Sequence, residues 1–358
     1  MDKKIIIAAG GTGGHLYPGL ALARVLRGKG CEVMFVVREN DIGKDVLVSE
    51  SFSFREIPVC GFPRKVSPEV IKFVLDLIRG FFAAQRIISE FKPAVVFGMG
   101  GYVSFPVIVA SKLSKIRTVI HESNFLPGLS NRFLSRIADI VAVSFEQSAK
   151  YFPISKVLVS GNPVRKELFE APYSEALKAL GLKPGRFTVL VFGGSQGASK
   201  LNRAVIESWE KLKDLAKKIQ FVHVTGSKDF ARIGEEYKRN NIPGSVFAYL
   251  NNIGNAYEAA DLVISRAGAM TVAELQVLNK PAILIPFPFA TANHQEPNAR
   301  VLEKEGKAKV ILEKNLSAGV LAQEIRNEVK NFSRHKKEIK MPSVLPQDIL
   351  ADLVFKAG

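Results

Sequence analysis

The sequence IIIAAGGTGGHLYPGLALARVL, from Ile5 to Leu26, joins an apolar run to a helical pattern through a loop rich in glycine. Glycine lets the backbone turn sharply and come close to a ligand, because it has no side chain beyond hydrogen. The helix that follows offers unpaired N–H groups and the positive end of its dipole. The stretch therefore predicts a strand, a loop and a helix that suit an anion such as a phosphate, or that form only a tight turn. His15, directly after the loop, is not explained by anion binding alone.

Short apolar runs alternate with helical patterns along the whole chain. The first half contains IIIAA, EVMFVV, AVVFG, RTVIHE and DIVAVSF, and the second contains FTVLVF, QFVHVTG, SVFAYL, DLVISR and PAILIPF. Near-continuous apolar runs of this kind are typical of parallel strands that are covered on both faces. The stretch VLVFGGSQGAS, residues 189–199, repeats the outline of the opening stretch half a chain later. The pattern predicts an α/β protein with two Rossmann-like, doubly wound parallel-sheet domains that face one another across a cleft.

The boundary between the predicted domains falls in GNPVR, residues 161–165, where glycine and proline interrupt the pattern. We expect residues 1–162 to form the N-terminal domain and residues 163–339 to form the C-terminal domain. A last helical pattern within residues 340–358 fits a helix that packs back on the first domain, but the pattern alone leaves its position open.

The composition excludes several classes of protein. The chain of 358 residues is 47% apolar and 23% charged, which is typical of a soluble globular protein. It lacks an apolar run long enough for a spanning helix or a signal peptide, and its two cysteines lack disulfide or metal spacing, so we expect a reducing cytoplasm. The net charge of +16 indicates an anionic partner, either a phosphorylated substrate, an acidic membrane surface or nucleic acid. No RNA-binding motif, zinc-finger spacing or basic-aromatic pattern accompanies the charge, which argues against nucleic acid.

The first glycine-rich loop matches neither of two common nucleotide motifs. GGTGG differs from the GxGxxG spacing of dinucleotide sites, and no Gly-Lys-Ser/Thr follows it as in a P-loop. The five histidines are scattered along the chain, which disfavours a metal site built from histidine. The residues themselves therefore predict no metal and only weakly support an NAD site.

Three further segments carry polar residues where predicted strands end. GGSQGA presents Ser195, HESN presents Asn124 beside Glu122, and GNPVR places Arg165 at the domain junction. Ligands of open α/β sheets bind at the carboxyl ends of the strands, and a guanidinium can clamp a phosphate through two hydrogen bonds. Each loop can instead be a plain turn, and Arg165 can be an ordinary exposed side chain.

Two segments of the second domain suit a sugar nucleotide. In SRAGAMTVAE, Thr271 can cap a helix that carries Glu274. The Glu274 carboxylate either accepts both hydroxyls of a ribose or only complements the helix dipole. In ATANHQEPNA, the side chains of His294, Gln295 and Asn298 can hydrogen-bond sugar hydroxyls, or they can cap a solvated helix.

Seven motifs occur in one order: GGTGGHLYPGLALA, GMGGYVSFP, HESN, GNPVR, VFGGSQGA, SRAGAMTVAE and HQEPNA. In this order, and over nearly the whole chain, they resemble the MurG family, bacterial transferases that add N-acetylglucosamine to lipid I to give lipid II for peptidoglycan. The resemblance implies a GT-B fold with an N-terminal domain for the acceptor and the membrane and a C-terminal domain for the UDP-sugar. It also implies an inverting hexosyltransferase without a bound metal or a cofactor.

The resemblance further implies a peripheral protein on the cytoplasmic face of the inner (plasma) membrane. Its partners would be UDP-N-acetylglucosamine, lipid I, an anionic membrane surface and other cell-wall synthesis proteins, with no nucleic acid. Such a protein would take part in cell-wall biogenesis and thereby in cell division and cell shape.

Individual residues take roles from the same resemblance. His15 is the candidate base for the 4-hydroxyl of N-acetylmuramic acid, because an unperturbed imidazole has a pKa of about 6.5; a structural cap is its other role. Leu250 would lie beside the uracil, Glu274 would bind the ribose and Gln295 would recognise the sugar hydroxyls. Substrate contacts are implied at Thr12, Gly13, Gly14, Asn124, Arg165, Ser195, Leu250, Ala269, Met270, Thr271, Val272, Ala273, Glu274 and Gln295.

Two positions depart from the family pattern, and two other functions stay open. Ala267 stands where serine is frequent, and Glu296-Pro297 replaces an aromatic-containing pair beside Gln295. One alternative is another GT-B enzyme, such as a UDP-N-acetylglucosamine epimerase, which would turn over the nucleotide sugar without any acceptor. The other is a non-catalytic nucleotide-sugar-binding protein or membrane scaffold.

The segment PEVIKFVLDLIRGFFAAQRIISEFK, residues 68–92, has one charged stripe and an apolar surface wider than one sheet requires. We expect this helix either to meet a membrane or to be buried between the sheet and a neighbouring helix. In the membrane interpretation, the bilayer interface receives Phe73, Leu77, Phe81 or Phe82, and anionic headgroups meet Lys72, Arg79, Arg64 and Lys65.

Overall fold

The first strand, β1 (Lys4–Ala8), turns Ile5 and Ile7 to one face of a sheet and Ile6 and Ala8 to the other. A strand that is apolar on both faces must be covered on both, so it takes the centre of a parallel sheet flanked by helices. The computed structural model, which describes residues 3–11, 13–41, 43–61, 69–194, 197–290, 293–332 and 341–356, contains two such sheets. It divides into a first unit of residues 1–165 and 343–358 and a second unit of residues 166–342.

The sheet of the first unit has seven parallel strands in the order β3-β2-β1-β4-β5-β6-β7. The strands after β1 are β2 (Glu32–Arg38), β3 (Ser53–Ile57), β4 (Val95–Gly98), β5 (Arg117–Glu122), β6 (Ile140–Val143) and β7 (Val157–Val159). At the centre, Ile7 lies opposite Phe35 of β2 and Phe97 of β4. The strand order changes direction between β1 and β4, and ligands of open α/β sheets bind at the carboxyl ends of strands at such a point.

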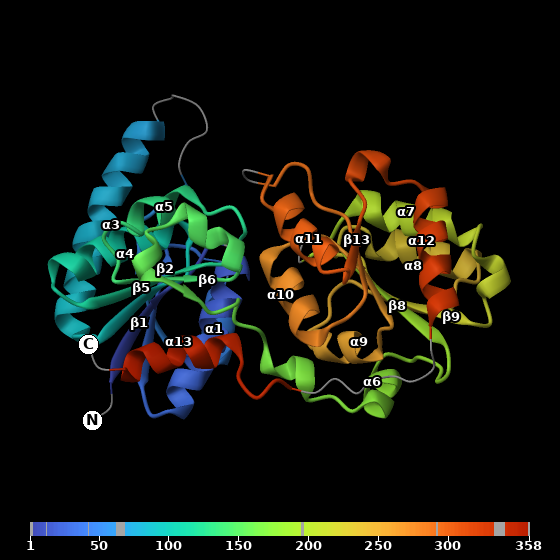
Figure 1. Cartoon of the computed structure of the whole chain (residues 1–358), viewed down its shortest axis with the longest axis horizontal. Helices are drawn as coiled ribbons and strands as arrows, with labels where there is room; N and C mark the ends of the chain where they lie inside the picture. The colour runs from blue at the N-terminus through green and yellow to red at the C-terminus, as the bar shows by residue number, and fades with distance from the viewer. Residues whose placement is uncertain are drawn as a thin grey trace. The chain divides into compact units, whose positions relative to one another are not determined.

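The helices of the first unit cover both faces of its sheet. They are α1 (Gly13–Gly28), α2 (Lys44–Ser49), α3 (Glu69–Phe91), α4 (Gly101–Leu113), α5 (Leu129–Leu134) and α13 (Pro346–Phe355), with 3-10 turns at Glu146–Tyr151 and Ile154–Lys156. Helices α1 and α13 pack on the face of Ile5 and Ile7, and α3 and α4 pack on the other face. Helix α13, red in Figure 1, lies beside the blue α1 and buries Leu350 and Val354 in their shared core.

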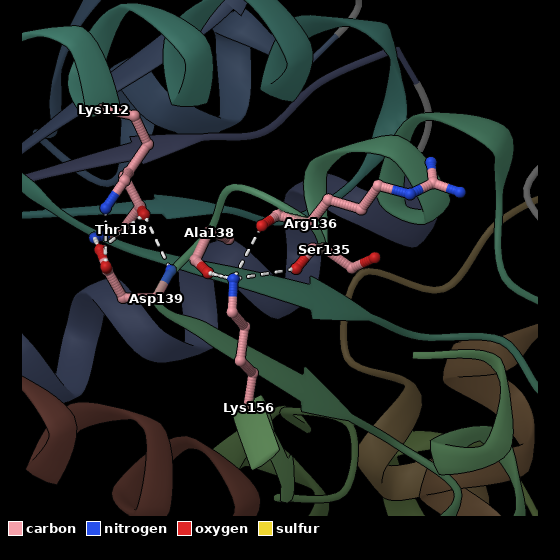
Figure 2. A network of polar contacts seen from close by, with 7 residues as sticks. All are labelled: Lys112, Thr118, Ser135, Arg136, Ala138, Asp139 and Lys156. Carbon is pink, nitrogen blue, oxygen red and sulfur yellow. Dashed lines mark hydrogen bonds and ion pairs between the residues drawn. The ribbon is translucent and has the colours of Figure 1, made fainter. Parts of the chain in front are cut away.

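Two lysines fix the connection between β5 and β6 (Figure 2). Lys156 Nζ donates to the carbonyls of Arg136 and Ala138 over 2.8 Å each, and these carbonyls follow the end of α5. Lys112 Nζ donates to Asp139 over 2.7 Å, and the second oxygen of Asp139 accepts the Thr118 backbone N–H over 2.8 Å. A cation at the carboxyl end of a helix satisfies carbonyls that have no helical partner. These contacts hold α5 against β5, whose carboxyl end lies next to the candidate site.

The second unit has a six-stranded parallel sheet in the order β10-β9-β8-β11-β12-β13. Its strands are β8 (Phe187–Phe192), β9 (Ile219–Val224), β10 (Gly244–Phe247), β11 (Leu262–Ser265), β12 (Ala282–Leu284) and β13 (Ala308–Val310). Its helices are α6 (Tyr173–Ala179), α7 (Ser199–Trp209), α8 (Phe230–Arg239), α9 (Ile253–Ala259), α10 (Ala269–Leu278), α11 (Gln295–Lys304) and α12 (Ala318–Asn331), with 3-10 turns at Lys166–Phe169, Lys213–Leu215 and Glu313–Asn315. The predicted pair of parallel-sheet α/β domains is confirmed.

Helix α3 has apolar side chains on its exposed face. The described side chains on its outer face include Ile71, Val74, Leu75, Ile78 and Phe82, which are exposed. Of the four residues among which the bilayer contact was expected, Phe82 is exposed and Phe73, Leu77 and Phe81 are half-buried. Phe73 meets Tyr102 of α4 edge to face, and Phe81 packs against the core. Arg64 and Lys65 lie outside the described residues. Among the helices that the structure describes, none is both long enough and apolar enough to cross a membrane.

Candidate functional site

The first glycine-rich loop is held by a buried carboxylate that the sequence did not single out. Gly11 donates its backbone N–H to Oδ2 of Asp41 over 2.6 Å, and Gly43 donates to Oδ1 over 2.9 Å. Asp41 follows β2 and is 4% exposed. A Cβ atom at Gly10 would lie 2.7 Å from Asp41 Oδ2, so the carboxylate requires a glycine there. One loop amide therefore binds the protein's own carboxylate, whereas Gly13 and Gly14 open helix α1, where amides lack helical acceptors. Thr12 lies outside the described residues.

His15 is the third residue of α1 and packs against the loop that follows β4. A Cβ atom at Gly100 would lie 2.9 Å from His15 Nδ1, and one at Gly101 would lie 3.2 Å from its Cδ2. Both glycines have positive φ, +97° and +74°, so this loop is shaped around the imidazole. Because β1 and β4 are neighbours where the strand order changes direction, His15 occupies the edge of the sheet at which ligands bind.

A second histidine, His121, is buried at the end of β5. Its pKa is lowered to about 4, chiefly by burial and to a smaller extent by the nearby His15, against a hydrogen bond to the Gly161 carbonyl that raises it. His121 Nε2 lies 3.1 Å from that carbonyl oxygen, and Ser123 Oγ lies 3.3 Å from Nδ1. His121 is therefore neutral at pH 7 and acts as a hydrogen-bonding support of the site.

The neighbouring Glu122 organises the HESN loop. Its carboxylate accepts the backbone N–H groups of Asn124 over 2.9 Å and Gly128 over 3.0 Å, and the Asn131 amide over 2.9 Å. Burial raises the pKa of Glu122, although these donors oppose the shift. The loop that carries Asn124 is thus fixed from within the first unit.

Arg165, at the end of the first unit, stacks on the same helix as His15. Its guanidinium carbon lies 5.3 Å from the ring centre of Tyr17, a distance at which a cation is attracted to an aromatic face. Within the first unit, His15 and the ring on which Arg165 stacks therefore belong to the same helix, α1. The predicted clamp of Arg165 on a phosphate stays a prediction.

The second glycine-rich loop follows β8 and is held by backbone against backbone. A Cβ atom at Gly197 would lie 2.2 Å from the Thr225 carbonyl oxygen, and φ of this residue is +73°. The buried Asn202 of α7 donates to that carbonyl and to Asp229, over 2.9 Å each. Burial opposes ionisation of Asp229, but hydrogen bonds from Arg232, Ser199 and Asn202 lower its pKa to about 2. Ser195 lies outside the described residues.

Helix α10 begins earlier than the SRAGAMTVAE motif suggested. Its N-cap is Gly268 and its first residue is Ala269, so Thr271 stands in the first turn and the prediction that it caps the helix is wrong. Of the proposed substrate contacts in this segment, Met270 and Thr271 are half-buried, while Ala269, Val272 and Ala273 are buried in the core.

Glu274 is the sixth residue of α10, too far along for a capping box. It is 2% exposed, and its Oε2 accepts the hydroxyl of the fully buried Tyr257 over 2.9 Å. Tyr257 lies on α9, which begins just after the half-buried Leu250 and is capped by Asn252 through the Gly254 N–H over 3.0 Å. No local pattern indicated this pairing, except that a buried tyrosine generally needs a partner for its hydroxyl.

Gln295 opens helix α11, and its side-chain carbonyl ties two loops together. It accepts the backbone N–H groups of Ala267 over 3.2 Å and Phe287 over 3.0 Å. Gln295 can therefore approach a sugar hydroxyl as a donor through its NH₂ group rather than as an acceptor. Asn298 is fully buried and donates to the Ala267 carbonyl over 3.4 Å, and its contact with sugar hydroxyls stays a prediction. The Glu296-Pro297 pair forms part of the first turn of α11, where proline is tolerated.

Two family models cover most of the chain. One, described as the glycosyltransferase family 28 N-terminal domain, matches residues 5–143, and the other, the glycosyltransferase family 28 C-terminal domain, matches residues 188–352. Within the described residues, His, Cys, Asp and Glu side chains form no group that could hold a metal ion.

Curated relatives match almost end to end. Proteins named UDP-N-acetylglucosamine–N-acetylmuramyl-(pentapeptide) pyrophosphoryl-undecaprenol N-acetylglucosamine transferase from Thermodesulfovibrio yellowstonii and Caldanaerobacter subterraneus are 41% and 42% identical to this chain. The alignments cover 95% and 90% of this chain and 93% and 90% of the relatives. These relatives have the name that the seven motifs predicted.

Solved structures match the fold. The crystal structure of MurG from Acinetobacter baumannii has a TM-score of 0.76 and 27% identity, and the match covers 99% of this chain and 100% of that one. The UDP-N-acetylglucosamine 2-epimerase of Methanocaldococcus jannaschii has a TM-score of 0.65 over 99% of this chain and 100% of its own. At 13% identity the epimerase shares the fold alone. The GT-B fold implied by the resemblance is confirmed.

Proposed function

The chain belongs to glycosyltransferase family 28, and on this premise we propose that it transfers N-acetylglucosamine from UDP-N-acetylglucosamine to an N-acetylmuramyl-pentapeptide pyrophosphoryl-undecaprenol, giving lipid II. The observation that carries the proposal is the nearly full-length likeness to relatives named for this reaction. An epimerase is disfavoured, because its likeness extends to the fold and not to the sequence.

On the acceptor side, we assign the base to His15. The oxygen of the N-acetylmuramyl 4-hydroxyl attacks the anomeric carbon, the bond from that carbon to the diphosphate breaks, and its electron pair leaves with UDP. His15 takes the hydroxyl proton as the new bond forms, and the direct displacement inverts α to β. Support comes from the position of His15 at the switch point of the first sheet, with its ring fixed on Gly100 and Gly101. General-base help of this kind contributes on the order of 10²–10⁴ in rate.

On the donor side, the second unit supplies the proposed contacts to the nucleotide sugar. Glu274 takes the ribose hydroxyls, the NH₂ group of Gln295 donates to a sugar hydroxyl, and Leu250 lies beside the uracil. The first amides of α10 and of α7, with the positive ends of these helices, favour the negative charge that grows on UDP. Substrate contacts are also proposed for Thr12, Gly13, Gly14, Asn124, Arg165, Ser195, Ala269, Met270, Thr271, Val272 and Ala273.

Incubation with labelled UDP-N-acetylglucosamine and a soluble lipid I analogue tests the reaction. We expect a β-linked disaccharide product and release of UDP that depends on the acceptor. Conversion of UDP-N-acetylglucosamine without acceptor would favour an epimerase. Tight binding of the nucleotide sugar with no product in the presence of acceptor would favour a non-catalytic protein.

We also propose that the first unit works on a membrane surface through α3. The exposed residues Ile71, Val74, Leu75, Ile78 and Phe82 follow one another at helical spacing and form one apolar stripe, which we call the α3 stripe. Phe82 is 65% exposed and Ile71 is 67% exposed. The exposed Lys72 and Arg79 lie on the same helix and suit anionic headgroups. An acceptor with a polyprenyl chain stays in the bilayer, so the enzyme must approach it there.

Co-sedimentation with anionic and neutral vesicles tests this surface. We expect binding to anionic vesicles that weakens as salt rises, and the double variant Ile78→Ser/Phe82→Ser should abolish most of it. Phe230→Ser, which changes an exposed aromatic residue of the second unit, is the matched control and should bind like the wild type. Equal sedimentation of the double variant and the control would place any membrane contact elsewhere.

A further inference from the structure

Tyr257 links three elements that surround the proposed ribose carboxylate. The residue is fully buried on α9, and its hydroxyl donates to Oε2 of Glu274 on α10 over 2.9 Å. Its ring meets the ring of Phe192 edge to face, with the centroids 5.9 Å apart. Phe192 is the last residue of β8, directly before the second glycine-rich loop. Tyr257 is thus held at its ring by the end of β8 and at its hydroxyl by Glu274, so it links the end of β8 to the Glu274 carboxylate.

The hydroxyl also limits how Glu274 can move. A glutamate side chain has three rotatable bonds, and a carboxylate accepts hydrogen bonds at about four lone-pair sites. A tyrosine donor and two ribose hydroxyls can therefore share one carboxylate. Because both residues are buried, the hydrogen bond between them is not replaced by water, and it favours one orientation of the Glu274 carboxylate.

We propose that Tyr257 is a positioning residue for ribose recognition: its hydroxyl holds the Glu274 carboxylate in the orientation that accepts the ribose hydroxyls. The inference rests on the proposed function, since it takes a uridine nucleotide as the ligand of the second unit. It goes beyond that function because it assigns selectivity for a ribonucleotide to a residue that does not touch the nucleotide.

Calorimetric titration of the full chain with UDP and with 2′-deoxy-UDP tests the proposal. In the wild type, loss of one hydrogen bond to a carboxylate should weaken the deoxynucleotide roughly 10- to 100-fold relative to UDP. In Tyr257→Phe, which keeps the ring and removes the hydroxyl, UDP should bind about 3- to 10-fold more weakly while 2′-deoxy-UDP changes little. The ratio between the two nucleotides should therefore shrink.

Two variants serve as references. Glu274→Gln removes the charge itself and should reduce the ratio at least as much as Tyr257→Phe. Tyr237→Phe removes another buried tyrosine hydroxyl of the second unit, one that lies 3.1 Å from His223 Nδ1, and it should leave the ratio unchanged. Melting temperatures of all variants establish that each is folded.

The possible outcomes distinguish the ribose role of Glu274 from the positioning role of Tyr257. If the wild type binds both nucleotides equally, the ribose role of Glu274 fails, and the positioning role fails with it. A second outcome is that Tyr257→Phe prefers UDP over 2′-deoxy-UDP as strongly as the wild type and Tyr237→Phe do, while Glu274→Gln loses the preference. Tyr257 then has a purely structural role, and the proposed function stands. An equal loss of the ratio in Tyr237→Phe would overturn the proposal, because any loosening of the unit would then suffice.

Discussion

The two glycine-rich loops look alike in sequence but are held in different ways. The loop after β1 is fixed by a charged side chain, because the Gly11 N–H donates to the buried Asp41. The loop after β8 is fixed by shape, because Gly197 leaves no room between its own backbone and the Thr225 carbonyl. The first loop also lies beside two histidines, His15 and His121, which interact electrostatically. The first loop is thus held by a side-chain carboxylate beside a helix that carries an imidazole, whereas the second is held by close contact of backbone with backbone.

The largest effect on activity is expected at His15, the proposed base beside the first loop. His15→Ala should lower turnover on the order of 10²–10⁴, because the acceptor hydroxyl loses its base. The affinity for UDP should stay unchanged, since the proposed nucleotide contacts of Glu274 and Gln295 lie in the second unit. Steady-state kinetics and calorimetry measure the two quantities. Turnover equal to that of the wild type would make the first loop a structural turn like the second.

A matched pair of glycine substitutions tests how each loop is held. In Gly197→Ala the new Cβ would lie 2.2 Å from a carbonyl oxygen, so the backbone must shift, and the free energy of unfolding should fall by about 3 kcal/mol. Gly11 has a similar φ, +82°, but a Cβ added there would meet no atom within 4 Å, so Gly11→Ala should lose only about 1–2 kcal/mol. Urea unfolding measures both. Equal losses of unfolding free energy in the two variants would mean that the two loops are not held in different ways.

Asp41→Asn tests whether the buried carboxylate holds the first loop. The asparagine keeps one acceptor oxygen but turns an NH₂ group toward the N–H of Gly11 or Gly43, so stability should fall by about 2 kcal/mol. Asp45→Asn, at an exposed position in the first turn of α2, is the control and should change stability by less than about 0.5 kcal/mol. Similar values for the two variants would mean that the carboxylate does not hold the loop.

The smallest effect concerns acid, and each unit has one buried histidine to test it. Burial lowers the pKa of His121 to about 4 and that of His223 to about 3, so both bind protons more readily when the chain is unfolded. The two histidines therefore contribute fully to the free energy of unfolding above the ordinary histidine pKa. This contribution declines as the pH falls from there toward their lowered pKa values. At pH 5.5 each should lower the stability of the wild type by about 1.4 kcal/mol relative to pH 7.5.

Urea unfolding of His121→Gln and His223→Gln at both pH values isolates each histidine from the opposing effect of Glu122, whose raised pKa favours the folded state in acid. Each variant should lose less stability on acidification than the wild type does. A variant as sensitive to acid as the wild type would show that its histidine is solvated.

Apolar runs were sufficient to predict the central strands and one edge strand, β10, but not the other three edge strands. Three strands, β3, β7 and β13, were not predicted, and each lies at an edge of its sheet. An edge strand has fewer neighbours to bury it, and β3 is accordingly SFREI, with only Ile57 buried. Such a segment has no continuous apolar run, so its pairing depends on contacts that a local pattern does not contain.

The site residues likewise divide into those with a local sequence signal and those whose partners are distant in the chain. The sequence indicated the loop of His15 and the helix of Glu274, because glycine clusters and strand ends are local signals. It did not indicate Asp41 or Tyr257, which meet their partners across 30 and 17 residues of chain. Thr271 was misjudged because the helix boundary moved by a few residues, which is the usual uncertainty of such a pattern.

Helix α13 determines which unit can finish folding first while the chain is being synthesised. The second unit is an insertion in the first, since residues 166–342 are made between the body of the first unit and the helix that closes its core. Until Leu350 and Val354 have emerged from the ribosome, the α1 face of the first sheet exposes apolar surface to the cell. The second unit, whose residues are contiguous, can finish folding before the unit that was begun first. The apolar face of the nascent first unit thus stays uncovered until residues 346–355 have been made.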